Sequence, residues 1–142
     1  MTKHNTSRSS RSPTFLPPIE RWPAAGVYQL HLRVSVTIRV RIGRLGRFTF
    51  PAGVYVYTGR AARGLAARVR RHVNGAPRKH WHVDYLLARR EVRVERVELV
   101  SDNPEDECSE NLAIRSNSPA TAPGFGASDC KAHCGSHLWR LG

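Results

Sequence analysis

Acidic residues are scarce in the first half of this sequence. Residues 1–83 contain 16 Lys and Arg against a single acid, Glu20, whereas residues 84–142 contain 7 basic and 10 acidic residues. A phosphate-contacting surface is therefore expected from the first half, and carboxylates for a metal ion from the second. The formal net charge of +12 favours a polyanionic partner, with nucleic acid the first choice.

Other absences narrow the class of protein. No run approaches the roughly 20 consecutive apolar residues of a membrane helix, so no membrane partner is expected. The N-terminal segment lacks the apolar core of a secretory signal, which favours the cytoplasm. Three cysteines, an odd number, argue against a disulfide framework. The length of 142 residues fits one domain and is too short for two.

Composition divides the chain in two. Residues 1–23 are rich in Ser, Thr, Arg and Pro and lack apolar periodicity before Phe15, which predicts a disordered basic leader. Residues 24–142 carry the periodic patterns of a folded domain.

Alternating apolar residues predict strands at 26–33, 36–42 and 48–58, which we interpret as an antiparallel meander. Alternation returns at 91–100, with a phase slip between Val94 and Val97 that is typical of a β-bulge, and a short strand is expected near 137–141. Helical spacing predicts helices at 62–73 and 81–89, and a third that begins within 102–105. The fold class is therefore α+β, a small antiparallel β-sheet flanked by helices.

Two short tyrosine motifs lie on the predicted strands. They are Gly26-Val27-Tyr28 and Tyr57-Thr58-Gly59, followed on the first helix by Arg68 and, four residues later, His72. Strand tyrosines are often ordinary half-buried residues, but Arg68 and His72 on one side of a helix would bring two phosphate-binding or acid–base groups to the strand ends. In this order and spacing the segment resembles the GIY-YIG endonuclease superfamily.

A closer resemblance covers nearly all of residues 26–141. It rests on the segments FTFPAG, HWHVDYLL, GFGASDC and SHL, at residues 48–53, 80–87, 124–130 and 136–138. These resemble a family of small GIY-YIG-related domains that occur alone or attached to the base-excision enzyme endonuclease III. The resemblance implies a GIY-YIG-like fold and metal-dependent phosphodiester hydrolysis on DNA, in a repair context.

The resemblance also assigns roles to individual residues. Tyr28 would activate the attacking water, and Tyr57 would help to hold the phosphate. Arg68 would neutralise charge that develops on the phosphate, a role that suits a permanently charged, forked donor. His72 would support proton transfer.

A carboxylate that binds Mg²⁺ or Mn²⁺ completes the site implied by the resemblance. Glu107 is the first choice because the closer family has a similar Glu-Cys pair at the start of this helix, and Glu110 is the second. Both could instead be solvated acids near a helix N-terminus.

Further basic groups could contact phosphate or nucleic acid. They are Arg60, Arg63, Arg71, His80 and His82. Arg60, directly after the second tyrosine motif, could bind phosphate or block the site. The alternative for His80 and His82 is that Trp81 belongs to the core and the imidazoles cap the helix or pair with Asp84.

The C-terminal segment is rich in Cys and His. Free or redox-active thiols in a reducing compartment are the first interpretation of these cysteines. The alternative is a structural zinc site built from Cys108, Cys130, Cys134 and His137, a set that would fix the terminal loop to the acidic helix.

Two functions compete at this stage. The first is the GIY-YIG-like endonuclease. The second is a catalytically silent nucleic-acid-binding module that uses the basic helix and the arginines 39, 41, 44 and 47 for backbone contacts.

Overall fold

A five-stranded mixed sheet forms the centre of the molecule. The computed structural model describes residues 13–75, 78–115, 121–127 and 134–142. In the sheet the strands follow the order β1-β6-β2-β5-β7. Their bounds are β1 Thr14–Leu16, β2 Gly26–Val34, β5 Gly53–Ala61, β6 Val92–Ser101 and β7 Leu138–Arg140.

Strand β2 is the middle of this sheet and pairs antiparallel with both β5 and β6. Leu30 and Leu32 of β2 are fully buried, as their alternating positions in the sequence predict. Strand β7 pairs antiparallel with β5, and β1 runs parallel to β6. The predicted slip is confirmed, because the partners of His31 and Leu32 step from Arg96 to Val94 and leave Glu95 as the additional residue of a bulge.

A separate hairpin interrupts the predicted meander. Strands β3 Ile38–Ile42 and β4 Gly46–Phe50 pair only with each other, across the 3-10 turn η2 Gly43–Leu45. The meander is therefore wrong, since β2 pairs with β5 and β6 and not with β3. The predicted strand at 48–58 is two strands, because Pro51 lacks the N–H that a continuous ladder needs.

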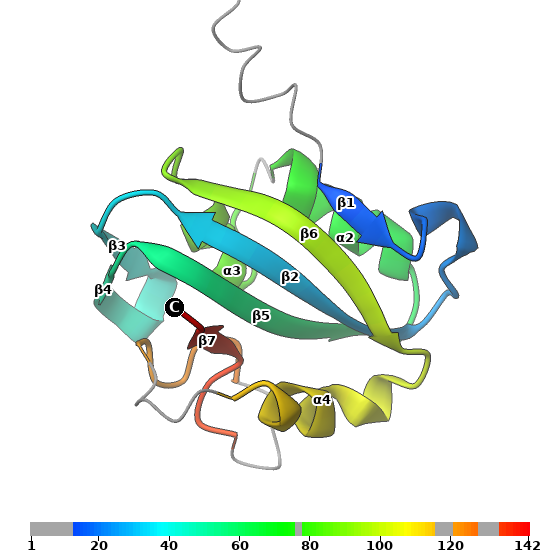
Figure 1. Cartoon of the computed structure of the whole chain (residues 1–142). Coiled ribbons are helices and arrows are strands. Elements are labelled where there is room, and N and C mark those ends of the chain that lie inside the picture. The colour runs from blue at the N-terminus through cyan, green and yellow to red at the C-terminus, as the bar shows by residue number, and fades with distance from the viewer. Residues whose placement is uncertain (1–12, 76–77, 116–120, 128–133) are drawn as a thin grey trace, which may run out of the picture.

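Helices cover the sheet from behind in the view of Figure 1, where α2 and α3 lie beyond the strands and α4 lies at the lower end. Their bounds are α2 Leu65–Asn74, α3 His82–Leu87 and α4 Glu107–Ala113, the last preceded by the 3-10 turn η3 Pro104–Asp106. Leu65 of α2 and Leu86 of α3 are fully buried in the core. The α+β class and the small sheet flanked by helices are confirmed.

The ordered fold begins earlier than the composition predicts. Residues 13–23 were expected to be part of a disordered leader, but they contain β1 and the 3-10 turn η1 Ile19–Arg21. Phe15 of β1 packs edge-on against Trp22, with 6.1 Å between the ring centroids. This aromatic contact holds a segment whose mostly polar composition predicts disorder. Residues 1–12 of the expected leader lie outside the described residues. Among the described residues, no helix has the length and apolar character needed to cross a membrane.

Candidate functional site

Three side chains from distant parts of the chain form a buried polar chain. The hydroxyl of Tyr28 on β2 lies 3.0 Å from Nε2 of His72 on α2. On the other side of the imidazole, Nδ1 lies 3.4 Å from Oδ1 of Asp84 on α3, a contact longer than a good hydrogen bond. All three residues are buried. The order hydroxyl, imidazole, carboxylate can carry a proton from the first group to the second, with the third stabilising the resulting charge.

Asp84 is held in place by the start of its own helix. Its Oδ2 accepts hydrogen bonds from the backbone N–H groups of His80, at 2.7 Å, and Trp81, at 2.9 Å. Burial would raise the pKa of Asp84, but the His72 ring and the two backbone donors outweigh burial and hold that pKa well below its usual range. Asp84 is therefore an anion that faces His72 at every pH near neutrality.

The two tyrosines are neutral groups in this structure. Burial and the neighbouring Tyr57 raise the pKa of Tyr28 well above its usual value, against a smaller opposing effect of Arg68. Burial and the Glu107 carboxylate raise the pKa of Tyr57 in the same way, and its ring lies 6.4 Å from that of Tyr28. Tyr28 is therefore not a phenolate, and its hydroxyl can donate to His72 Nε2 when the Asp84 carboxylate keeps the hydrogen of the ring on Nδ1.

Glycine at the end of the second motif makes room for the Tyr28 ring. Gly59 is the partner of Tyr28 across the β2–β5 ladder. A Cβ at this position would lie 2.6 Å from both Cζ and the hydroxyl oxygen of Tyr28, closer than real carbon contacts. The glycine of the Tyr-Thr-Gly tripeptide is thus explained by packing against Tyr28 of the first motif.

Arginines of α2 border this cluster and stack on Trp81. The guanidinium carbon of Arg68 lies 4.6 Å from the Trp81 ring centroid, and that of Arg71 lies 4.9 Å away. Arg68 also donates a hydrogen bond to the backbone carbonyl of Arg60, and Arg71 pairs with Asp84 at 3.3 Å. The structure therefore places the predicted residues Arg68 and Arg71 beside His72, with Arg68 partly exposed to solvent.

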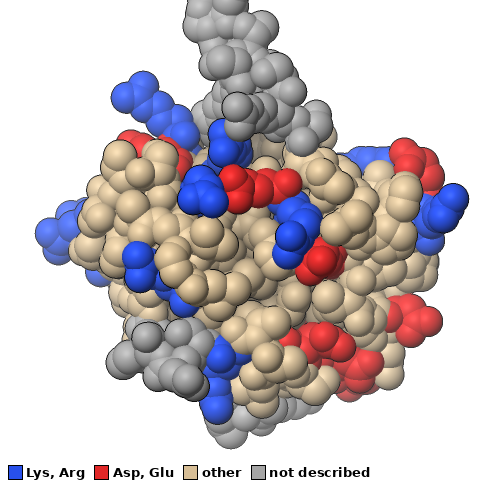
Figure 2. Space-filling view, viewed as in Figure 1, with Lys and Arg blue, Asp and Glu red and all other residues tan. Residues whose placement is uncertain are grey.

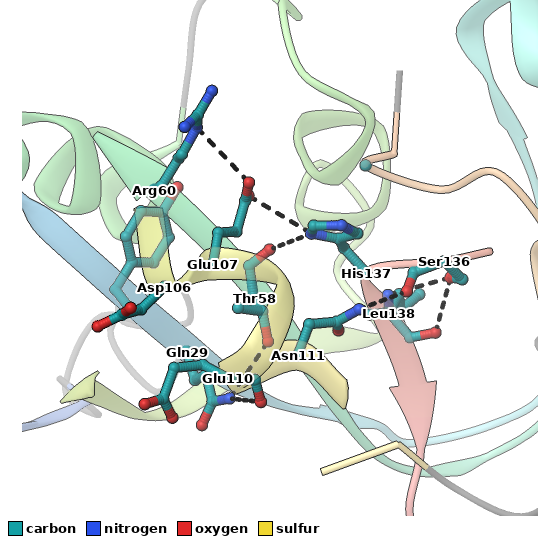
Figure 3. Close-up of polar contacts among 12 residues, drawn as sticks. Gln29, Thr58, Arg60, Asp106, Glu107, Glu110, Asn111, Ser136, His137 and Leu138 are labelled. Carbon is teal, nitrogen blue, oxygen red and sulfur yellow. Dashed lines mark hydrogen bonds and ion pairs between the residues drawn. The ribbon is translucent and has the colours of Figure 1, made fainter. Parts of the chain in front are cut away.

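Glu107, at the start of α4, lies between two cationic or polar groups (Figure 3). Its Oε1 is 3.6 Å from Arg60 Nε, and its Oε2 is 3.4 Å from His137 Nδ1. The negative charge of this carboxylate helps to raise the pKa values of both Tyr28 and Tyr57. Glu110 lies at a different part of the helix, where its backbone carbonyl accepts a hydrogen bond from Gln29.

The three remaining residues predicted to contact phosphate lie in different environments. Arg63 is exposed. His80 is also exposed, and its ring packs edge-on against Trp81 at 4.4 Å. His82 turns away from this group, because its Nδ1 accepts the backbone N–H of Gly126 at 2.8 Å, and burial lowers the pKa of His82. The alternative in which these two imidazoles pair with Asp84 is not what the structure shows.

Sequence reasoning missed the role of Asp84 as the partner of His72. One signal could have found it, since Asp84 is the first acid after Glu20 in an otherwise basic stretch. A carboxylate at the third position of a helix also accepts backbone N–H groups ahead of that helix, which fixes it in place.

The predicted zinc ligands are partly brought together. Ligand atoms of Cys108, Cys134 and His137 all lie within 4.8 Å of one another. Cys130, the fourth member of the predicted set, lies outside the described residues.

A basic groove of about 480 Å³ lies between the β3–β4 hairpin and α3. Its lining contains five cationic side chains, Arg39, Arg41, Arg47, Lys79 and Arg89. Tyr85 of α3 lines the groove, whereas the preceding residue, Asp84, contacts His72. The short helix α3 therefore borders both the groove and the buried chain.

The opposite side of the molecule has a different charge pattern. Figure 2, viewed as in Figure 1, shows blue and red groups side by side over the sheet and red groups gathered at the lower right, near η3 and α4. Ion pairs explain this mixture, for example Arg33 with Glu95 at 2.9 Å and Arg96 with Glu98 at 3.6 Å. Paired arginines offer less net charge to a polyanion than the groove does.

Fold and site together define a small α+β domain with a buried tyrosine–histidine–aspartate chain bordered by arginines. Comparison with protein families gives the identity at family level. The chain belongs to the DUF123 family, described as a domain of unknown function, whose model matches residues 27–142. Comparisons with curated proteins and with solved structures found no match.

Proposed function

We propose that this protein is a metal-dependent phosphodiesterase that acts on DNA, a GIY-YIG-like endonuclease with a role in repair. The observation that supports it best is the chain from Tyr28 through His72 to Asp84, with Arg68 at its side. Phosphodiester hydrolysis needs a proton acceptor for the attacking water and a cation for the phosphate, and these residues supply both.

Proton transfer in this proposal passes through a neutral Tyr28. The hydroxyl oxygen accepts a proton from water while its own proton moves to His72 Nε2, 3.0 Å away. Asp84 then stabilises the imidazolium from the Nδ1 side. This sequence needs no phenolate, which agrees with the raised pKa of Tyr28.

Phosphate binding falls to Arg68, with Tyr57 as a second donor. Stacking on Trp81 orients the Arg68 guanidinium and leaves it partly exposed. The Arg60 side chain is 45% exposed and lies 3.6 Å from Glu107, so it adds positive charge beside that carboxylate. Preorganised cations of this kind stabilise charge that develops on the phosphate.

Glu107 is the residue that fits Mg²⁺ or Mn²⁺. One carboxylate beside a phosphate site is a common Mg²⁺ arrangement, in which waters and substrate oxygens supply the other ligands. The contacts of Glu107 at 3.4 and 3.6 Å are long enough to be exchanged for a closer ligand. A bound ion would supply charge stabilisation at the leaving oxygen.

A nuclease screen tests this function. Purified protein is incubated with branched, flapped and abasic DNA in Mg²⁺ and in Mn²⁺. We expect Arg68→Ala to lower the cleavage rate about 10²–10³-fold, and Tyr28→Phe about 10²–10⁴-fold. Arg33→Ala is the matched control, because Arg33 pairs with Glu95 on β6, away from the buried chain. Absence of product, or full activity of both site variants, would contradict the proposal.

The basic groove supports a second candidate, a nucleic-acid-binding module without turnover. Its five cationic side chains form a surface that can follow a phosphate backbone. Salt titration of DNA binding separates the two candidates. A triple variant at Arg39, Arg41 and Arg47 should lower the slope of log K against log salt by about 0.9 per lost contact, and the triple variant at Arg33, Arg93 and Arg96 should not. Binding without cleavage in both metals favours the module.

The cytoplasm is the compartment that we propose for this activity. Its basis is the three cysteines, an odd number that suits a reducing environment better than a disulfide framework.

A further inference from the structure

The C-terminal segment and helix α4 bring two thiols and one imidazole together. Cys108 lies on α4, and Cys134 and His137 lie just before β7. Their ligand atoms fall within 4.8 Å of one another. A tetrahedral zinc ion, at about 2.3 Å from sulfur and about 2.1 Å from nitrogen, holds its ligands about 3.5–3.8 Å apart. Shifts of about 1 Å, which side-chain rotation can provide, therefore give metal-binding geometry.

The hydrogen bonding of His137 determines which of its ring nitrogens can bind a metal. Its Nδ1 lies 3.2 Å from the backbone carbonyl of Thr58 and 3.4 Å from the Glu107 carboxylate. Both neighbours are acceptors, so Nδ1 carries the hydrogen and Nε2 presents a lone pair. Metal-binding histidines characteristically have this arrangement, in which the second ring nitrogen donates to a carbonyl or carboxylate.

Other contacts hold α4 and the C-terminal segment together without a metal. The side-chain amide of Asn111 on α4 donates to the Ser136 carbonyl at 2.8 Å and accepts from the Trp139 indole at 3.1 Å. The backbone N–H of His137 donates to the Phe125 carbonyl at 2.7 Å. Cys134 is 5% exposed and His137 is fully buried. A buried, preorganised pocket of soft ligands is the environment that zinc prefers over magnesium.

We propose that Cys108, Cys134 and His137 bind a zinc ion that fixes the C-terminal segment to α4. The ion would also fix the imidazole of His137, whose Nδ1 lies 3.4 Å from the Glu107 carboxylate. The site is separate from the phosphodiesterase proposal and stands if that proposal fails.

Metal content of the full-length protein tests the site. Protein purified without chelators is analysed for zinc by mass spectrometry and then treated with a mercurial in the presence of a zinc-sensitive dye. We expect about one zinc per chain, released as the thiols react. Cys134→Ser and His137→Asn should lower the zinc content at least several-fold. His31→Gln, which alters a partly buried histidine bonded to Glu98, is the control and should keep the zinc.

Cobalt substitution provides the second measurement and does not depend on how the variants fold. Wild-type protein depleted of zinc and titrated with Co²⁺ should show thiolate-to-cobalt charge transfer and the intense visible bands of tetrahedral cobalt. Three results would overturn the proposal: zinc far below one per chain after reconstitution, a cobalt spectrum without the thiolate band, or a disulfide between Cys108 and Cys134 in protein kept under reducing conditions.

Discussion

Two buried histidines, His72 and His137, share one arrangement and differ in what they face. Each has Nδ1 at 3.4 Å from a carboxylate, Asp84 for the first and Glu107 for the second. The other nitrogen of His72 meets the Tyr28 hydroxyl, whereas His137 lies within 4.8 Å of two thiols. A hydroxyl offers a proton and thiols offer metal ligands, so the same side chain suits proton transfer in one region and metal binding in the other.

The two carboxylates differ in how firmly they are held. The Asp84 side chain is 1% exposed and accepts two backbone N–H groups, while that of Glu107 is 18% exposed and lies 3.6 Å from Arg60 and 3.4 Å from His137, both long contacts. Asp84 is therefore part of the rigid framework. Glu107 can turn toward an added ligand.

Replacement of each carboxylate by its amide should give the largest difference in stability between the two regions. Asp84→Asn removes the charge that faces His72 and Arg71 in a buried setting and should lower the free energy of unfolding by about 3 kcal/mol. Glu107→Gln alters a partly exposed pair and should cost less than about 1 kcal/mol. Urea unfolding at neutral pH measures both. Equal losses would show that the two regions do not differ in rigidity.

The pH dependence of stability provides a second test of the charge on Asp84. Because the folded pKa of Asp84 is depressed, its contribution to stability is present above the unfolded pKa of about 3.9 and is lost as pH falls through the folded pKa. The gap in unfolding free energy between wild type and Asp84→Asn should therefore be constant from pH 7 to about pH 5 and shrink below about pH 4. A gap that does not change in acid would contradict the assigned charge of Asp84.

Gly59→Ala tests how closely the histidine cluster is packed and should have the next largest effect. The new Cβ would press on the Tyr28 ring, and overpacking of this kind costs about 2 kcal/mol. Tyr28→Leu removes the atoms that clash, so the double variant should lose less stability than the sum of the single variants. Additive losses in thermal or urea unfolding would mean that Tyr28 is not the group that Gly59 accommodates.

Local patterns in the sequence predicted most of the elements of this fold. Alternation gave the strands that became β2, β3 and β6, and helical spacing placed Arg68 and His72 four residues apart on α2. These features depend on neighbours along the chain, which is why a period can reveal them.

Pairing between distant segments was beyond such patterns. The β3–β4 hairpin lies between β2 and β5 in the sequence. No local pattern predicts that β2 pairs with β5 instead of with β3. The Asp84–His72 contact joins two helices, and strand β1 is only three residues long in a polar segment. The family resemblance named Tyr28 and His72, but the carboxylate behind them required the assembled fold.

Tyr28→Phe should destabilise the protein less than Asp84→Asn or Gly59→Ala, because it removes one hydroxyl and its hydrogen bond to His72, worth about 1 kcal/mol. The stability loss caused by Tyr28→Phe should also change with pH in the alkaline range. The folded pKa of Tyr28 is raised, so its contribution is present below the unfolded pKa of about 10 and is lost as pH rises toward the folded value. The difference in unfolding free energy between wild type and Tyr28→Phe should therefore become smaller above pH 10.

Tyr55, whose pKa burial raises to about 12, lies outside the histidine cluster and provides the matched substitution, Tyr55→Phe. If only Tyr55→Phe shows the alkaline narrowing, Tyr28 is not the buried proton donor on which the comparison of the two histidines depends.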